Sequence, residues 1–315
     1  MTPVDYDEFS YFHENAAEFG IAYEGPPVVR RVFVEVGPDR RLSALVWGDA
    51  APELVLLHGG AQNAHTWDTV ALALGRPLVA IDLPGHGHSD GGRSGSLGLQ
   101  DNAQDVATAV RALAPEAGAV VGMSLGGMTT IALTTEAPEL VRRVVLVDVT
   151  PGVTPAKSKA ITDFVNGPES FASFDDILAR TVEHNPTRTV SSLRRGILHN
   201  AEQRPDGSWV WRYARFRTGE TRVPVDVGAL WDAIGRIAVP LLLVRGMAAG
   251  SVVDDGDEAE LLRRLPSARV EHVDGAGHSV QGDRPIELAR LIDEFVSGAH
   301  QGRGRPADGV GPGGR

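Results

Sequence analysis

Short runs of β-branched and aliphatic residues alternate with helical stretches along most of the chain, and this alternation limits the fold more than any other feature. The runs cover residues 28–36, 42–48, 54–59, 77–85, 118–127, 141–152, 239–246 and 268–275. The helical stretches lie around 65–74, 99–113, 126–137, 257–265 and 284–296. Parallel strands that are buried on both faces appear in a sequence as continuous apolar runs of this kind. The pattern therefore predicts an α/β sheet.

The alternation stops between Pro155 and about Ile237. This segment contains two expected helices, near 156–165 and 173–183, and an aromatic, arginine-rich stretch at 209–217. We interpret it as an inserted, mainly helical cap. The predicted organisation is a core at 28–152 and 238–298, a cap at 153–237 and, because glycine and proline occur there without periodicity, a disordered tail at 299–315.

The first 27 residues are expected to form an acidic N-terminal arm. Phe9, Phe12, Ala16 and Phe19 recur at helical spacing, which predicts a helix within it. The arm could pack on the domain or on a second subunit, or it could act as a lid over a site. We favour the packed arm, and a homo-oligomer through the arm or the cap stays open.

Composition and charge exclude several classes of function. The 30 basic and 41 acidic side chains leave a net charge of −11, so we expect neither nucleic acid nor a membrane as a partner. The chain has no cysteine, which excludes a thiolate nucleophile and cysteine-ligated metals.

The N-terminus lacks the pattern of a signal peptide, so we expect a cytoplasmic protein. Arginine outnumbers lysine 28 to 2, which indicates a GC-rich bacterial genome.

Ser124 is the strongest candidate for a catalytic residue. It is the serine of a Gly-x-Ser-x-Gly motif at 122–126, directly after an apolar run and directly before a helical stretch. A turn from strand to helix at this point would hold the hydroxyl in a strained conformation at the carboxyl edge of the sheet. This context predicts a nucleophilic serine.

A nucleophilic serine needs a base, and His278 is the candidate that we favour. It follows the last apolar run and precedes the final helical stretch, where a loop can reach back over the same sheet edge. His86 and His88 are the main competitors, and their spacing raises the question of a metal site. No cluster of further ligands accompanies them in the sequence. We therefore expect them to order a loop, and we expect no metal and no cofactor.

Three motifs occur in the order that is typical of α/β-hydrolases: Leu57-His58-Gly59-Gly60 after the third run, the serine motif, and Gly277-His278 after the last run. On these motifs the chain resembles the α/β-hydrolase family from residue 28 to residue 298. The resemblance implies a mostly parallel eight-stranded sheet flanked by helices and carrying an inserted cap. It also implies an oxyanion hole, built from the backbone N–H of Leu125 and that of Gly60 or its neighbour Ala61.

The third member of the expected triad departs from the family pattern. Many relatives carry the acid after the seventh strand, where this chain has Ala249. Some take it from the end of the sixth strand, and Asp148 stands there, so we assign the acid to Asp148. The alternatives are one of Asp254, Asp255 and Asp257, or a serine–histidine dyad without an acid.

Aromatic residues of the cap predict a hydrophobic substrate. Phe164, Trp209, Trp211, Tyr213, Phe216 and Trp231 lie in the cap, and some of them should line the cleft, although each could instead dock the cap on the core. Ala61, Trp67 and Met123 are further candidates for substrate contact because they are close in sequence to the oxyanion turn or to the serine.

These features together predict a serine hydrolase that cleaves a carboxylic ester or lactone through an acyl-enzyme. An acid after the sixth strand combined with an aromatic cap resembles some lactone-opening hydrolases, including those acting on macrocyclic lactones such as zearalenone. A carbon–carbon bond hydrolase of the diketone type would use the same triad. A non-catalytic ligand receptor on this fold would be expected to lose Ser124 or His278, and both are present.

Overall fold

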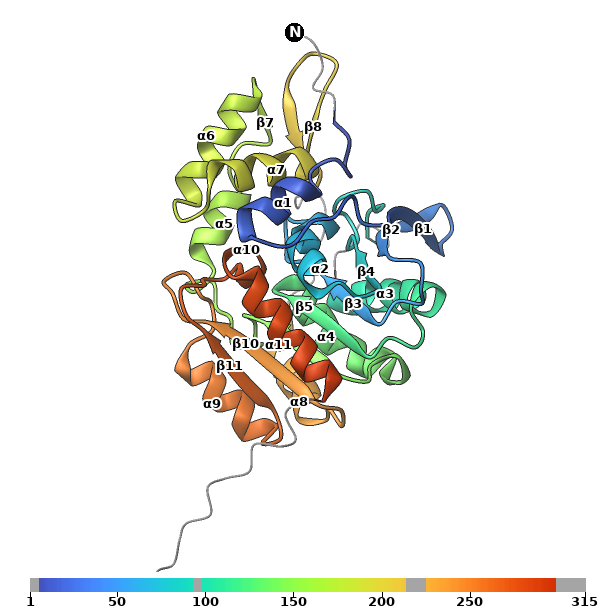
Figure 1. The fold of residues 1–315 in the computed structure, drawn as a ribbon. Helices are drawn as coiled ribbons and strands as arrows, with labels where there is room; N and C mark the ends of the chain where they lie inside the picture. Colours follow the sequence, from blue (N-terminus) through green and yellow to red (C-terminus); the bar gives the residue numbers. More distant parts are fainter. Residues whose placement is uncertain (1–5, 93–97, 214–224, 299–315) are drawn as a thin grey trace, which may run out of the picture.

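A central sheet of eight strands organises the molecule in the computed structural model, which describes residues 6–92, 98–213 and 225–298 (Figure 1). The strand order is β1-β2-β4-β3-β5-β6-β10-β11. Strand β2 runs antiparallel to β1 and β4, and the remaining neighbours pair in parallel. The strands span Val29–Gly37 (β1), Arg40–Trp47 (β2), Leu54–Leu57 (β3), Leu78–Ile81 (β4), Ala119–Met123 (β5), Val144–Val147 (β6), Leu241–Gly246 (β10) and Arg269–Val273 (β11). The predicted α/β fold with a mostly parallel eight-stranded sheet is confirmed.

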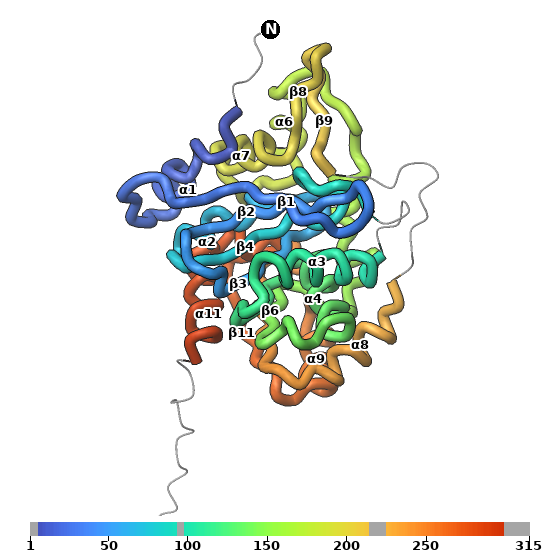
Figure 2. Tube along the Cα trace, turned by 90° about the vertical axis from the view of Figure 1, so that its right-hand side faces the viewer, coloured from blue at the N-terminus to red at the C-terminus, as the bar shows by residue number. Residues whose placement is uncertain are grey.

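Helices cover both faces of this sheet. In the core they span Asp68–Leu74 (α2), Leu99–Leu113 (α3), Leu125–Glu136 (α4), Val227–Gly235 (α8), Asp255–Arg264 (α9), Val280–Asp283 (α10) and Pro285–Ser297 (α11), with 3-10 turns at Ala64–Trp67 (η1) and Pro138–Leu140 (η3). Figure 2 shows α3 and α4 on the face of the sheet that is turned to the viewer. No helix in the described part of the chain is long and apolar enough to cross a membrane.

Side chains along each central strand alternate between two apolar cores. In β3, Leu54 and Leu56 pack in the core beneath α2 and α11, whereas Val55 and Leu57 pack in the core beneath α3 and α4. All four are fully buried. Because both faces are covered, the strands need apolar residues at every position, which is why they appear as continuous runs in the sequence.

The inserted segment after β6 lies above the sheet in Figure 1. Its helices are Lys159–Val165 (α5), Phe174–His184 (α6) and Val190–Asn200 (α7), and its small antiparallel sheet consists of Ser170–Phe171 (β7), Trp209–Trp211 (β9) and Ala201–Gln203 (β8). The sequence did not predict α7 or this sheet. We use the term cap segment for the described residues 153–213.

Helix α8 does not belong to the cap, which corrects the predicted boundary at residue 237. Leu230, Trp231 and Ile234 on this helix are buried in the same apolar core as α3 and α4. Helix α8 packs mainly against α4 and α9. Trp231 is therefore buried on the face of the sheet that α3 and α4 cover, and the Arg264 guanidinium lies 5.7 Å from its ring centroid. The expectation that Trp231 lines a substrate cleft is wrong.

The helix expected in the N-terminal arm is present as α1 (Phe12–Phe19). Phe12 is 1% exposed, and the centroid of its ring lies 5.0 Å from that of Trp47. On the other side of the helix, Glu14 and Glu18 form ion pairs with the buried Arg195 of α7. Helix α1 thus connects the core to the cap segment. The expected tail at 299–315 lies outside the described residues.

We expect Phe12→Ala to lower the free energy of unfolding by roughly 3–5 kcal/mol, because it removes a fully buried aromatic ring and leaves a cavity beside Trp47. Urea unfolding followed by far-UV circular dichroism measures this change. Phe33→Ala is the matched control, since Phe33 is 46% exposed, and it should cost less than about 1 kcal/mol. Equal losses in the two variants would show that α1 is not held to the core through Phe12.

Candidate active site

Ser124 lies in a sharp turn between β5 and α4. Its backbone has φ 50° and ψ −115°, and α4 begins at the next residue, Leu125. A positive φ is strained for a residue with a side chain, and such strain is typical of positions that the surrounding structure holds for function. The turn places a serine at the carboxyl end of a central strand, as the sequence motif predicted.

Two glycines allow neighbouring chain segments to approach this turn. A Cβ atom at Gly126 would overlap the Leu57 carbonyl, and one at Gly59 would overlap the Met123 sulfur and lie 3.3 Å from the Ser124 Cβ. The turn after β3 therefore lies directly against the serine.

Met123 itself is 1% exposed, and its side chain lies in the apolar core between the sheet and helices α2 and α11. Strand alternation turns its side chain into this core, and substrate contact by Met123 stays a prediction.

Asp148 is aligned with Ser124 by the register of the sheet. Met123 and Val147 are paired residues of the parallel strands β5 and β6, so Ser124 and Asp148 both follow directly after a matched pair. Asp148 also has a positive φ, 46°, and its side chain is fully buried. The two candidate residues therefore leave adjacent strands at the same level, each in a strained conformation.

His278 reaches back from the loop after β11 to this carboxylate. Its Nδ1 lies 2.9 Å from Asp148 Oδ2. The backbone N–H of Gly246 and the Ser251 hydroxyl donate to Oδ1, at 3.0 and 2.6 Å, and the Val252 N–H donates to Oδ2 at 3.0 Å. The loop after β10, where many relatives carry the acid, thus supplies hydrogen-bond donors to an acid on the neighbouring strand.

The alternative acids have other partners. Asp254 and Asp257 form a capping box at the start of α9, and Lys157 forms ion pairs with both. Asp255 has a 96% exposed side chain and pairs with Arg245. Of the four aspartates considered from the sequence, the structure brings Asp148 into contact with His278.

Buried and partly buried hydrogen bonds hold the turn after β3. His58 is fully buried; the Leu83 N–H donates to its Nε2 at 2.9 Å, so its Nδ1–H donates to the Gly59 carbonyl at 2.7 Å. Burial lowers the His58 pKa to about 3, so the ring is neutral. Ala61 has a φ of 60°, and its carbonyl accepts from Asn200 Nδ2 at 2.7 Å. A cap residue therefore holds the turn that carries Gly60 and Ala61.

The Leu125 N–H is at the first position of α4, where an amide has no partner within the helix. Gly60 is exposed at the surface of the facing turn. The structure thus places the two predicted oxyanion donors on the elbow and on the segment packed against it.

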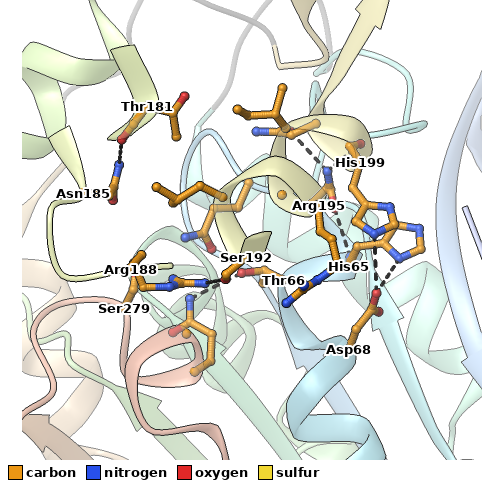
Figure 3. Close-up of a pocket in the computed structure, with 18 of the residues that line it drawn as sticks. His65, Thr66, Asp68, Thr181, Asn185, Arg188, Ser192, Arg195, His199 and Ser279 are labelled. Atoms are coloured by element: carbon orange, nitrogen blue, oxygen red, sulfur yellow. Dashed lines mark hydrogen bonds and ion pairs between the residues drawn. The ribbon is translucent and has the colours of Figure 1, made fainter. Parts of the chain in front are cut away.

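A cavity of about 200 Å³ lies between the arm, the cap segment and the core (Figure 3). Its lining includes Gln62, in the turn after β3, and Ser279, next to His278, whereas Ser124 and His278 themselves are not among the described residues that line it. Most of its lining side chains are polar, including Arg188, whose Nη2 donates to Ser192 Oγ at 2.6 Å. The sequence analysis missed these residues. Motif spacing carries no signal for them, because they come from separate elements.

Two of the aromatic residues that were expected to line the cleft, Phe164 and Trp211, do line this cavity. Trp67 does not line the cavity. It is the last residue of η1, and its fully buried side chain packs in the core that contains α2 and α11. Trp209 is buried in the cap segment, with its ring 5.0 Å from that of Phe174, and Tyr213 is buried where it bridges to His86. Phe216 lies outside the described residues.

His86 is a buried loop residue, as expected. Its Nδ1–H donates to the Pro84 carbonyl at 3.0 Å, and burial lowers its pKa. The N–H of His88 donates to Asp82 at 3.1 Å. Both histidines therefore take part in the packing of the loop after β4.

Comparisons with known proteins agree with this fold. Residues 54–291 match the family described as the alpha/beta hydrolase family. The esterase Rv0045c of Mycobacterium tuberculosis is 45% identical over 294 residues, which are 91% of this chain and 94% of that protein. A crystal structure of the same esterase superposes with a TM-score of 0.82 at 42% identity, covering 94% of this chain and all of the other. The structure of E-2-(acetamidomethylene)succinate hydrolase gives a TM-score of 0.72 at 25% identity, covering 86% and 99% of the two chains. The chain belongs to the α/β-hydrolase family.

Proposed function

We propose that this protein is a serine hydrolase of carboxylic esters, with Ser124 as the nucleophile, His278 as the base and Asp148 as the acid that orients it. The observation that carries the proposal is the 2.9 Å contact between His278 Nδ1 and Asp148 Oδ2, one strand away from the strained serine turn. The esterase name of the mycobacterial relative supports the reaction class.

Each member of the proposed triad has its own role in ester hydrolysis. Asp148 accepts the Nδ1–H of His278, which leaves Nε2 free to take the proton from the Ser124 hydroxyl. The serine oxygen attacks the carbonyl carbon, and the N–H groups of Leu125 and Gly60 stabilise the negative charge that develops on the carbonyl oxygen. His278 then protonates the leaving alcohol. A water molecule, deprotonated by the same histidine, hydrolyses the acyl-enzyme and restores the serine.

Three donors besides His278 hold the Asp148 carboxylate, and this explains how the acid works from an unusual strand. The Gly246 N–H, the Ser251 hydroxyl and the Val252 N–H donate to its two oxygens and so fix its orientation. An ionised carboxylate at this position stabilises the imidazolium that forms during attack.

The cavity favours a compact substrate with polar groups. Its volume of about 200 Å³ is below the roughly 300–1,000 Å³ of sites for drug-sized ligands. Arg188, Asn185 and Thr181 supply polar contacts, and Phe164 and Trp211 supply an apolar wall. We therefore propose small esters and lactones as substrates, in preference to a large hydrophobic macrocycle such as zearalenone.

Ser124→Ala should lower kcat by roughly 10⁴–10⁶ while the protein stays folded, because the nucleophile is lost. His278→Ala should cost about as much, and the double variant should be no slower than either single variant, because nucleophile and base act as a unit. Hydrolysis of a p-nitrophenyl ester measures these rates, and a fluorophosphonate probe should label the wild type but not Ser124→Ala. Labelling or turnover that persists in folded Ser124→Ala would contradict the assignment.

Asp148→Asn should lower kcat by roughly 10²–10⁴, because the amide keeps the shape but loses the charge that orients and stabilises His278. Asp254→Asn is the matched control. Asparagine is also a good helix N-cap, so this variant should stay within about threefold of the wild type. If the control loses activity while Asp148→Asn keeps it, the acid comes from the loop before α9. If both remain active, the enzyme works as a dyad.

A substrate panel tests the reaction and the size limit together. Values of kcat/KM should fall as the acyl group outgrows the cavity, so short-chain esters and small lactones should be hydrolysed faster than long-chain esters or zearalenone. A vinylogous diketone should not be cleaved. Cleavage of the diketone without ester hydrolysis would favour a carbon–carbon bond hydrolase. Binding without turnover of any member would favour a ligand receptor.

A further inference from the structure

A second group of chemically active side chains lies on the side of the cavity away from Arg188 and Ser279. It consists of His65 on η1, Asp68 at the start of α2 and His199 on α7 (Figure 3). The sequence analysis assigned none of them a role. All three are more than nine-tenths buried, and all three line the cavity.

Two polar atoms of this cluster have no hydrogen-bond partner among the described residues. They are Nε2 of His199 and Oδ1 of Asp68. Leaving a buried polar atom unpaired costs about 1–3 kcal/mol, so two of them in one cluster call for an explanation. A ligand that accepts both lone pairs would provide one.

The three side chains are spaced as metal ligands. One potential ligand atom from each lies within 4.8 Å of the others. Asp68 Oδ2 is 2.9 Å from His65 Nδ1 and 3.9 Å from His199 Nε2. Bond lengths of 2.0–2.2 Å from one ion to two ligands require the ligand atoms to be about 3–3.6 Å apart. The two imidazole rings are stacked, with centroids 3.9 Å apart and an angle of 13° between their planes, so one ring must turn for both lone pairs to point at one ion.

Each histidine also has an outer partner of the kind found around metal sites. His65 Nε2 lies 3.1 Å from Glu8 Oε2, and His199 Nδ1 lies 2.7 Å from the Tyr6 hydroxyl. Metal-bound histidines usually donate their second N–H to a carboxylate or another oxygen, which directs the lone pair of the first nitrogen at the ion. Both outer partners belong to the N-terminal arm.

The local charge favours a divalent cation. Leaving aside the proton that His65 carries and that a metal ion would displace, the carboxylates of Glu8, Asp68 and Asp82 face the guanidinium of Arg31, which leaves two negative charges. The nearby Arg195 is already paired with Glu14 and Glu18. An ion of charge +2 would balance this buried group.

We propose that His65, Asp68 and His199 bind a divalent transition-metal ion, with Zn²⁺ as the best match for two imidazoles and a carboxylate. The open fourth position faces the cavity, where water can occupy it. The ligands come from the core and the cap segment and their outer partners from the arm, so the ion ties three parts of the chain together. Protonation of His65 competes with the metal: burial opposes the proton, but Asp68 and Glu8 outweigh burial and raise the pKa of His65 to about 9.

The test uses the full chain without an affinity tag, treated with a chelator and titrated with ZnCl₂ by isothermal calorimetry at pH 8. We expect one zinc ion per chain and a higher Tm in its presence. His199→Gln and Asp68→Asn should each weaken binding by at least about tenfold, and Tyr6→Phe should weaken it by roughly tenfold through the outer contact. His272→Gln is the matched control, because it removes an exposed histidine that pairs with Glu258, and it should bind as the wild type does.

CoCl₂ provides a second readout, since the visible spectrum of bound Co²⁺ reports its ligands, and it should be lost in His199→Gln. The proposal is overturned if the wild type binds no zinc, if His199→Gln and Asp68→Asn bind as tightly as the wild type, or if His272→Gln abolishes binding. Circular dichroism shows whether each variant is folded. If His199→Gln is unfolded, Asp68→Asn and Tyr6→Phe decide by the same criteria. None of these readouts depends on ester hydrolysis, so the result stands apart from the proposed function.

Discussion

Four donors converge on the buried carboxylate of Asp148, and they come from the two strands that follow it in the sheet and from the loops after those strands. Gly246 ends β10, Ser251 and Val252 lie in the loop after it, His278 lies after β11, and the aspartate itself follows β6. A buried carboxylate is tolerated only where its lone pairs are satisfied. The ends of three adjacent parallel strands are thereby held in one arrangement, and the histidine is held with them.

The cap segment and the arm are attached through buried charges as well as through apolar contact. Arg31 joins Glu8 of the arm to Asp82 of the core, and Arg195 of α7 pairs with Glu14 and Glu18 of α1. Such pairs contribute little net stability, because each charge loses its hydration on burial. They do specify how the parts meet, since a misplaced arm would leave these charges unpaired. The cavity lies at this meeting point.

Sequence reasoning succeeded where the signal is local and failed where it is not. The continuous apolar runs located all eight strands, and strand order placed Ser124, Asp148 and His278 at one sheet edge. The same reasoning treated Trp67 and Trp231 as pocket residues because they are aromatic and close to the right motifs. Packing decides such cases: each ring can be buried in the core next to it, which removes more apolar surface from water than a place in a polar cleft.

The sequence by itself determined the sheet, the serine turn and the order of the triad candidates, because these depend on hydrophobic periodicity and on residues within a few positions of one another. Only the tertiary structure decided which acid meets His278, because the answer depends on the loop after β10 folding its donors onto Asp148. It also brought His65, Asp68 and His199 together from the core and the cap. No periodicity links residues more than a hundred positions apart; their distance is set by how the helices and loops pack.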